Sequence, residues 1–123
     1  MRFVTVAVAA VFVLTTPALA ADDLMAGTYG NTVISKSSTI EGHWHYRADH
    51  SFDSSFSTPM GSLQSKGTWA IDDKGQLCRT FDAPPPGVTN PLCVAWTARK
   101  IGDAWQVTSN GRTSNLTLVA GVQ

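Results

Sequence analysis

The spacing of short β-prone runs constrains the fold of this chain more than any other feature. After residue 21, no stretch keeps apolar residues at positions i, i+3, i+4 and i+7 for three turns, the pattern of an amphipathic helix. Runs rich in β-branched and aromatic residues recur instead, and clusters of Gly, Asp, Asn, Ser or Pro separate them every eight to twelve residues. This spacing is typical of an all-β domain.

We predict eight strands, at residues 26–34, 40–48, 52–57, 64–71, 76–82, 92–99, 104–108 and 115–120. The run DDKG at 72–75 has the residues of a type I turn, and tight turns favour an up-and-down antiparallel meander. Such a sheet removes its exposed edges by closing into a small barrel, with a two-sheet sandwich as the alternative. The segment 83–91 (APPPGVTNP) contains four prolines, which lack the N–H group that a sheet needs, so we expect a stiff surface loop there.

The first twenty residues have the pattern of a secretory signal peptide. Arg2 provides a positive start, residues 3–14 are an apolar run, and Ala18-Leu19-Ala20 is a cleavage pattern of small residues. The apolar run is shorter than the about 20 residues that span a bilayer. We therefore expect residues 1–20 to be removed. Residues 21–123 are then predicted to form a single β-barrel domain, periplasmic or secreted, with no membrane anchor after cleavage.

The two cysteines, Cys78 and Cys93, both lie in the part of the chain that we expect to be exported. An even number of cysteines in an oxidising compartment favours a disulfide. Their spacing differs from the C-x-x-C of redox-active pairs, so we expect a structural bond. Closing this loop stabilises a fold by about 3 kcal/mol in the chain-entropy description.

The charge of the chain is balanced. Nine Lys and Arg residues face nine Asp and Glu residues, and removal of Arg2 leaves eight against nine, a net charge of −1. Because basic residues form no cluster, nucleic acid lacks its usual electrostatic attraction. No basic amphipathic stretch indicates a membrane surface either. We expect a monomer that does not bind nucleic acid.

The aromatic residues between positions 44 and 56 define an apolar strand face. Side chains alternate faces along a strand, and a three-residue turn at 49–51 would pair residue 44 with 56 and residue 46 with 54. The apolar face then collects Trp44, Tyr46, Ala48, Phe52 and Phe56. A two-residue turn would mix polar and apolar side chains on each face, so we prefer the three-residue turn.

The opposite face of this hairpin carries His43 and His45, which raises the question of a metal site. An H-x-H pair on a strand places two imidazoles on one face, but zinc needs at least three protein ligands. The next position on that face is Arg47, a cation, and Asp53 is expected to pair with it. His50 lies in the turn. We therefore predict a polar outer face with solvated histidines rather than a metal site.

Sequence motifs for catalysis are absent. The run MGSLQ at 60–64 lacks the second glycine of a nucleophile elbow, and no glycine-rich phosphate loop occurs. Adjacent aspartates, as at 72 and 73, face opposite ways on a strand and make no carboxylate pair. We expect no enzymatic activity and no cofactor.

Four tryptophans, Trp44, Trp69, Trp96 and Trp105, remain to be explained. The interior of an eight-stranded barrel is either filled with side chains or holds one small ligand. These large apolar rings therefore either form the core or line a cavity. As ligand-binding candidates we select Trp44, Tyr46 and Trp69.

Several motifs resemble those of the small exported lipocalin-like β-barrel proteins of alphaproteobacteria, a family of uncharacterised function. They are GTYGNTV, Phe52 after the RADHS turn, KGTWAIDDKGQLC, LCVAW and TLVAG, which together cover most of residues 24–120. The resemblance implies export and a calyx-like barrel, and it implies no catalytic residues. The family's usual D-G turn is here Asp49-His50.

Three functions remain in order of preference. The first is an exported, non-enzymatic module that holds a small apolar ligand inside the barrel. The second is a protein-binding module, because the chain is also similar to exported bacterial protease inhibitors, which are small one-disulfide barrels. Its contact would be the N-terminal arm 21–25 or the loop 83–91. The third is metal binding through His43 and His45. A cavity of at least ~300 Å³ would favour the first.

Overall fold

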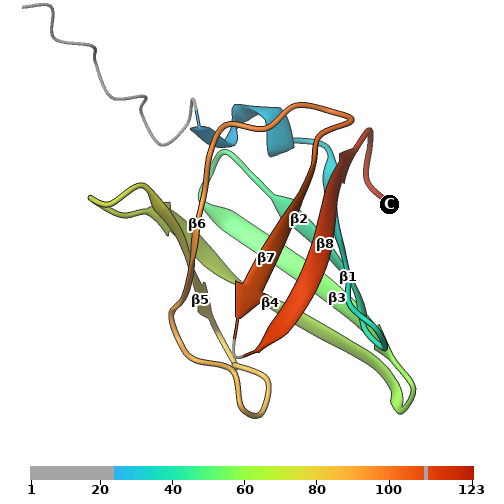
Figure 1. Cartoon of the computed structure of the whole chain (residues 1–123). Helices are drawn as coiled ribbons and strands as arrows, with labels where there is room; N and C mark the ends of the chain where they lie inside the picture. The colour runs from blue at the N-terminus through green and yellow to red at the C-terminus, as the bar shows by residue number, and fades with distance from the viewer. Residues whose placement is uncertain (1–23, 110) are drawn as a thin grey trace, which may run out of the picture.

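Eight antiparallel strands form one continuous sheet, as the spacing of the β-prone runs predicts (Figure 1). The computed structural model describes residues 24–109 and 111–123, so the predicted signal peptide, 1–20, lies outside the described residues. The elements are η1, a 3-10 helix (Ala26–Thr28), and the strands β1 (Thr32–Lys36), β2 (Glu41–Tyr46), β3 (Ser51–Thr58), β4 (Gly61–Ile71), β5 (Gln76–Phe81), β6 (Leu92–Ala95), β7 (Ala104–Ser109) and β8 (Arg112–Val119).

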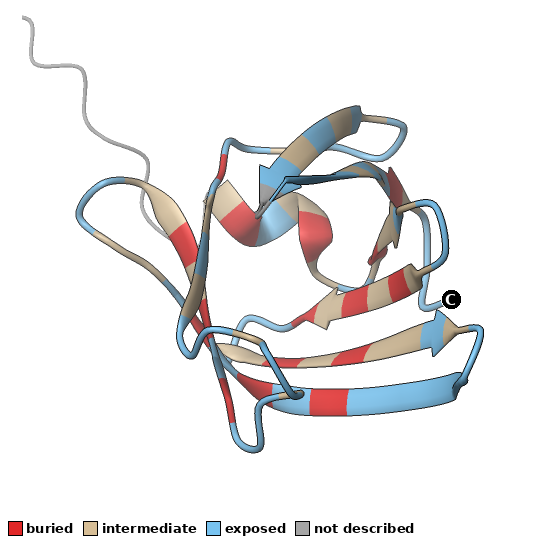
Figure 2. Ribbon diagram, turned by 60° about the horizontal axis from the view of Figure 1, so that its bottom comes forward, coloured by how far each residue is buried: buried red, intermediate tan, exposed pale blue. Residues whose placement is uncertain are grey.

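The strands follow one another round a nearly closed barrel. Their order in the sheet is β6-β5-β4-β3-β2-β1-β8-β7, so β1 lies between β2 and β8, and β6 and β7 are the two edges. Figure 2 shows the sheet curling round on itself. The eight-stranded meander is therefore confirmed and the two-sheet sandwich is wrong. The barrel departs from full closure because β6 and β7 do not pair, which leaves a seam between them.

The start of the first predicted strand is wrong, because residues 26–28 form the helix η1 instead. Local hydrogen bonds explain the turn: the hydroxyl of Thr28 donates to the carbonyl of Met25 (2.7 Å), and the side-chain amide of Asn31 donates to the carbonyl of Gly27 (2.9 Å). Gly30 supplies a positive φ of 72°, which directs the chain into β1. This turn seats Met25 in the core, where its side chain is fully buried.

The second disagreement is β6, which was expected to extend to residue 99 and ends at Ala95. Trp96 follows, and its indole N–H donates to the carbonyl of Leu24 at 3.1 Å. Its ring meets that of Trp105 on β7 edge to face, with centroids 5.6 Å apart. These side chains bridge the seam that the backbones of β6 and β7 leave unpaired.

The core consists of the side chains that alternate toward the inside of the barrel. In β2 these are Trp44 and Tyr46, and in β3 the inward positions include Phe52, which is 1% exposed. The rings of Trp44 and Phe56 meet at right angles with centroids 5.2 Å apart. The apolar face predicted for this hairpin is thus confirmed, except that Ala48 lies exposed in the turn.

The turn of this hairpin has the predicted length but lies one residue earlier, at 48–50. Tyr46 is opposite Phe52, and the backbone N–H of Arg47 donates to the carbonyl of Ser51 at 3.0 Å. His50 adopts a φ of 69°, a left-handed conformation that favours glycine. Its ring stacks on Trp69 with centroids 4.1 Å apart. This contact accounts for a non-glycine residue at the position.

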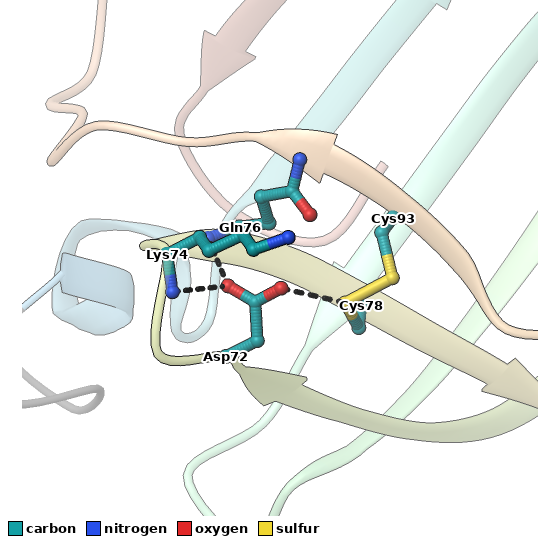
Figure 3. Close-up of a disulfide and its surroundings, with 5 residues drawn as sticks. All are labelled: Asp72, Lys74, Gln76, Cys78 and Cys93. Atoms are coloured by element: carbon teal, nitrogen blue, oxygen red, sulfur yellow. Dashed lines mark hydrogen bonds between the residues drawn. A yellow bond between two sulfur atoms is a disulfide. The ribbon is translucent and has the colours of Figure 1, made fainter.

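Cys78 and Cys93 form the predicted disulfide, which joins directly opposite positions of β5 and β6 (Figure 3). The neighbouring turn is organised by Asp72, whose carboxylate accepts from the backbone N–H groups of Lys74 (3.0 Å) and Gln76 (2.8 Å). The same carboxylate lies 3.8 Å from the sulfur of Cys78. This contact is not a hydrogen bond, because a disulfide sulfur carries no proton. The turn holds the start of β5, and the disulfide attaches the edge strand β6 to β5.

Candidate binding cavity

A cavity of about 640 Å³ lies inside the barrel and reaches the seam between β6 and β7. Side chains of every strand except β4 line it, together with the loop 83–91. Its apolar walls are rich in aromatic rings, which belong to Trp44, Tyr46, Phe56, Phe81, Trp96 and Trp105. The cavity exceeds the ~300 Å³ that a small-molecule site needs.

Two of the three predicted ligand-binding residues, Trp44 and Tyr46, line this cavity. The third, Trp69, is not among its lining residues. The side chain of Trp69 is buried at 2% exposure between His50 and Tyr29, whose ring centroid lies 6.2 Å away. Its indole N–H donates to the carbonyl of Arg47 at 2.9 Å. Trp69 thus packs the part of the barrel interior beside the β2–β3 turn and η1.

The proline-rich loop 83–91 forms one wall of the cavity rather than a free surface segment. Pro85 and Val88 line the cavity, and Val88 also packs against the core. The side-chain amide of Asn90 accepts from the backbone N–H of Phe81 (2.9 Å) and donates to its carbonyl (3.2 Å). These bonds imitate a strand pairing and hold the loop against β5, next to the disulfide.

Arg79 is a cavity residue that the sequence-based selection missed. It lies on β5 between Leu77 and Phe81, which also point inward, and its side chain is only 7% exposed. Its guanidinium lies 4.3 Å from the ring centroid of Trp44 and donates to the hydroxyl of Tyr46 at 3.5 Å. The signal was available, because an arginine that alternates with buried apolar residues occupies an inward position of its strand.

The electrostatics of the cavity are one-sided. Its described lining includes two cations, Arg79 and the exposed Arg112 on β8, and no Asp or Glu. Burial raises the pKa of the Tyr46 hydroxyl, while the neighbouring Arg79 lowers it by a smaller amount. Tyr46 therefore stays a neutral phenol at neutral pH. The cavity is thus apolar with a buried positive charge beside a neutral hydroxyl.

The histidine face lies on the outside of the barrel, as expected, but the imidazoles are less solvated than expected. His45 contacts Asp53 through Nδ1 (2.9 Å) and the backbone oxygen of Gln123 through Nε2 (3.1 Å). Nδ1 of His43 lies 3.3 Å from that same oxygen. Arg47 pairs with Asp53, as predicted. Among residues 24–109 and 111–123, no group of three or more His, Cys, Asp or Glu side chains could hold a metal ion.

A second pocket, of about 580 Å³, includes His45 and Asp53 among its polar lining. A histidine beside a carboxylate can serve as a catalytic base, but only if its other nitrogen faces a substrate. In His45 that nitrogen is engaged by the oxygen of Gln123. These contacts tie Gln123 to β2.

Within the described part of the chain, no helix is long and apolar enough to pass through a bilayer. Comparisons of the chain with protein-family models, with curated proteins and with solved structures found no match. The resemblance to exported lipocalin-like proteins therefore stays a prediction. Function has to be argued from the cavity itself.

Proposed function

We propose that this protein is an exported, non-enzymatic binding module that holds a small, largely apolar molecule in the barrel cavity. The observation that supports the proposal is the cavity itself, which is about 640 Å³ in volume and lined by six aromatic rings. Ligand sites are typically concave, mostly apolar and furnished with few polar groups, and Trp44 and Tyr46 are then binding residues. The disulfide and the predicted signal peptide support a periplasmic or secreted location.

A protein partner is the second candidate, and one observation favours it. The tip of the β3–β4 hairpin exposes Met60 at 97% and Leu63 at 43%. The contact regions expected for an inhibitor-like protein give less support. Met25, in the expected arm 21–25, is buried, residues 21–23 lie outside the described residues, and the loop 83–91 is a cavity wall. We therefore rank the small ligand first.

The test uses phenylnaphthylamine, a neutral apolar dye whose fluorescence rises in apolar surroundings. Two neighbouring positions on β8 provide matched variants, because Leu116 lines the cavity and Thr117 is exposed. Leu116→Trp should narrow the cavity and weaken dye binding about tenfold or more, whereas Thr117→Trp should bind as the wild type does. Ser114→Phe, also a lining position, replaces Leu116→Trp if circular dichroism shows that the latter is unfolded.

Two results would contradict the proposal. One is a wild-type protein that does not bind the dye at all. The other is equal binding by Leu116→Trp and the Thr117→Trp control, which would place the dye on the outer surface. Native mass spectrometry of protein purified from its own periplasm would identify a natural ligand that stays bound. A retained small molecule supports the proposal, and a co-purified protein supports the second candidate.

A further inference from the structure

The buried guanidinium of Arg79 is the feature that goes beyond an apolar ligand. A charged side chain inside a protein is costly unless an opposite charge and hydrogen bonds compensate it. Arg79 forms no ion pair with any residue in 24–109 or 111–123, and its Nε has no hydrogen-bond partner there. The interactions that it does form leave most of its capacity unused.

These interactions cover one face and one nitrogen of the guanidinium. The ring of Trp44 lies 4.3 Å from the central carbon, a cation–π contact, and the hydroxyl of Tyr46 accepts one bond at 3.5 Å. A guanidinium has five N–H donors in a planar fork. Arg79 lines a cavity whose lining residues include no carboxylate. An anion inside the cavity would supply the missing acceptor.

A carboxylate fits this place by charge and geometry. The planar fork of arginine binds a carboxylate through two parallel hydrogen bonds. Because Tyr46 accepts from Arg79, its own hydroxyl proton is available to donate to the same carboxylate. One buried cation is neutralised by one negative charge, which favours a monocarboxylate over a dianionic group. The aromatic walls suit the rest of such a molecule.

We infer that the natural ligand is an amphiphilic monocarboxylate, whose acid group binds Arg79 and Tyr46 while its apolar part fills the cavity toward the seam between β6 and β7. This inference rests on the proposed function, because it specifies the chemical class of the ligand in the same cavity. The exposed Arg112 at the cavity lining adds positive charge that attracts the acid on entry.

The test compares two probes with the same tail, dodecanoic acid and dodecanol, by displacement of phenylnaphthylamine at neutral pH. The wild type should bind the acid about tenfold more tightly than the alcohol, since hydrogen bonds between ionised partners are the strong ones. Arg79→Gln should remove this preference, so that the acid no longer binds more tightly than the alcohol. Lys74→Gln, which loses the same charge from an exposed turn, should keep the wild-type preference.

The outcomes separate the two claims. If neither probe displaces the dye and neither binds directly in calorimetry, the proposed function fails. If both bind the wild type equally, the cavity holds apolar molecules and the carboxylate inference is wrong. If Arg79→Gln does not fold, Tyr46→Phe takes its place: it should weaken binding of the acid several-fold more than binding of the alcohol. An unchanged acid preference in the variant that folds would also overturn the inference.

Discussion

Removal of the disulfide should destabilise the protein globally and loosen β6 in particular. Cys78 and Cys93 are separated by 15 positions, and closing a loop of this length removes about 3 kcal/mol of conformational entropy from the unfolded chain. A domain of this size is stable by only ~5–15 kcal/mol, so the loss is a large fraction of the total. The corresponding decrease in melting temperature is about 12–24 °C.

The location of the bond adds a local effect. β6 has four residues, is paired only with β5 and forms an edge of the sheet. Without the disulfide, β6 and the adjoining loop 83–91 should open more easily than the central strands. Because both form cavity walls, ligand binding should weaken together with β6.

The assay is urea unfolding of the Cys78→Ala/Cys93→Ala double variant, with amide hydrogen exchange to resolve β6. The matched control is Thr108→Ala/Thr113→Ala, which changes an opposed pair on β7 and β8 that is linked only by a hydroxyl contact of 3.0 Å. We expect the control to lose about 1 kcal/mol or less. A cysteine variant that is as stable as this control, with β6 amides as protected as in the wild type, would refute the reasoning.

Two further predictions concern the core and the outer face. Phe52→Ala should cost about 3–5 kcal/mol in urea unfolding, because the ring is 1% exposed, and Phe56→Ala should cost less because that ring is only half-buried; equal costs would contradict this. Burial raises the pKa of the Asp53 carboxyl, but hydrogen bonds from His45 and Arg47 outweigh it and lower the pKa overall. The carboxylate therefore stabilises the fold above its unfolded pKa of about 4, and this contribution is lost as the pH falls through the lower folded value. In Asp53→Asn, the free energy of unfolding should therefore fall less on acidification than in the wild type, by less than about 1 kcal/mol because the pair is partly exposed. The same dependence of unfolding free energy on pH in both proteins would contradict this.

The strand order could be predicted because short β-prone runs alternate with turn residues at regular spacing, and the disulfide because the chain has two cysteines, which allow one pairing. Alternation fixes which side chains of β2 and β3 point inward, and a register error of an even number of residues leaves those faces unchanged. The predicted pairing of residue 44 with 56 was wrong, since Trp44 is opposite Ser54. The inward faces were nevertheless correct. Which side chains face inward depends only on whether their positions in the strand are odd or even, and the sequence shows this directly.

Features that depend on distant contacts could not be predicted. The position of the β2–β3 turn depends on His50, which stacks on Trp69 of β4. The early end of β6 depends on Trp96, which bonds to Leu24, 72 positions earlier. No local pattern contains either contact, because each forms only when the barrel assembles.

The candidate site was predictable in part. Trp44 and Tyr46 were selected as aromatic residues of an inward face, and both line the cavity. Trp69 satisfies the same criterion and packs elsewhere, because composition and alternation do not distinguish one end of a barrel from the other. Arg79 was not among the selected residues, although its position on β5 between the inward Leu77 and Phe81 indicated burial.

The central claim is that the ligand lies inside the barrel, with its acid group at Arg79. Anomalous X-ray diffraction from crystals grown with terminally brominated dodecanoic acid tests this most directly. The account predicts a bromine peak inside the cavity, near the seam between β6 and β7, with the carboxylate against Arg79 and Tyr46. A bromine peak only on the outer surface would contradict the claim. So would an empty cavity at a saturating concentration of the brominated acid.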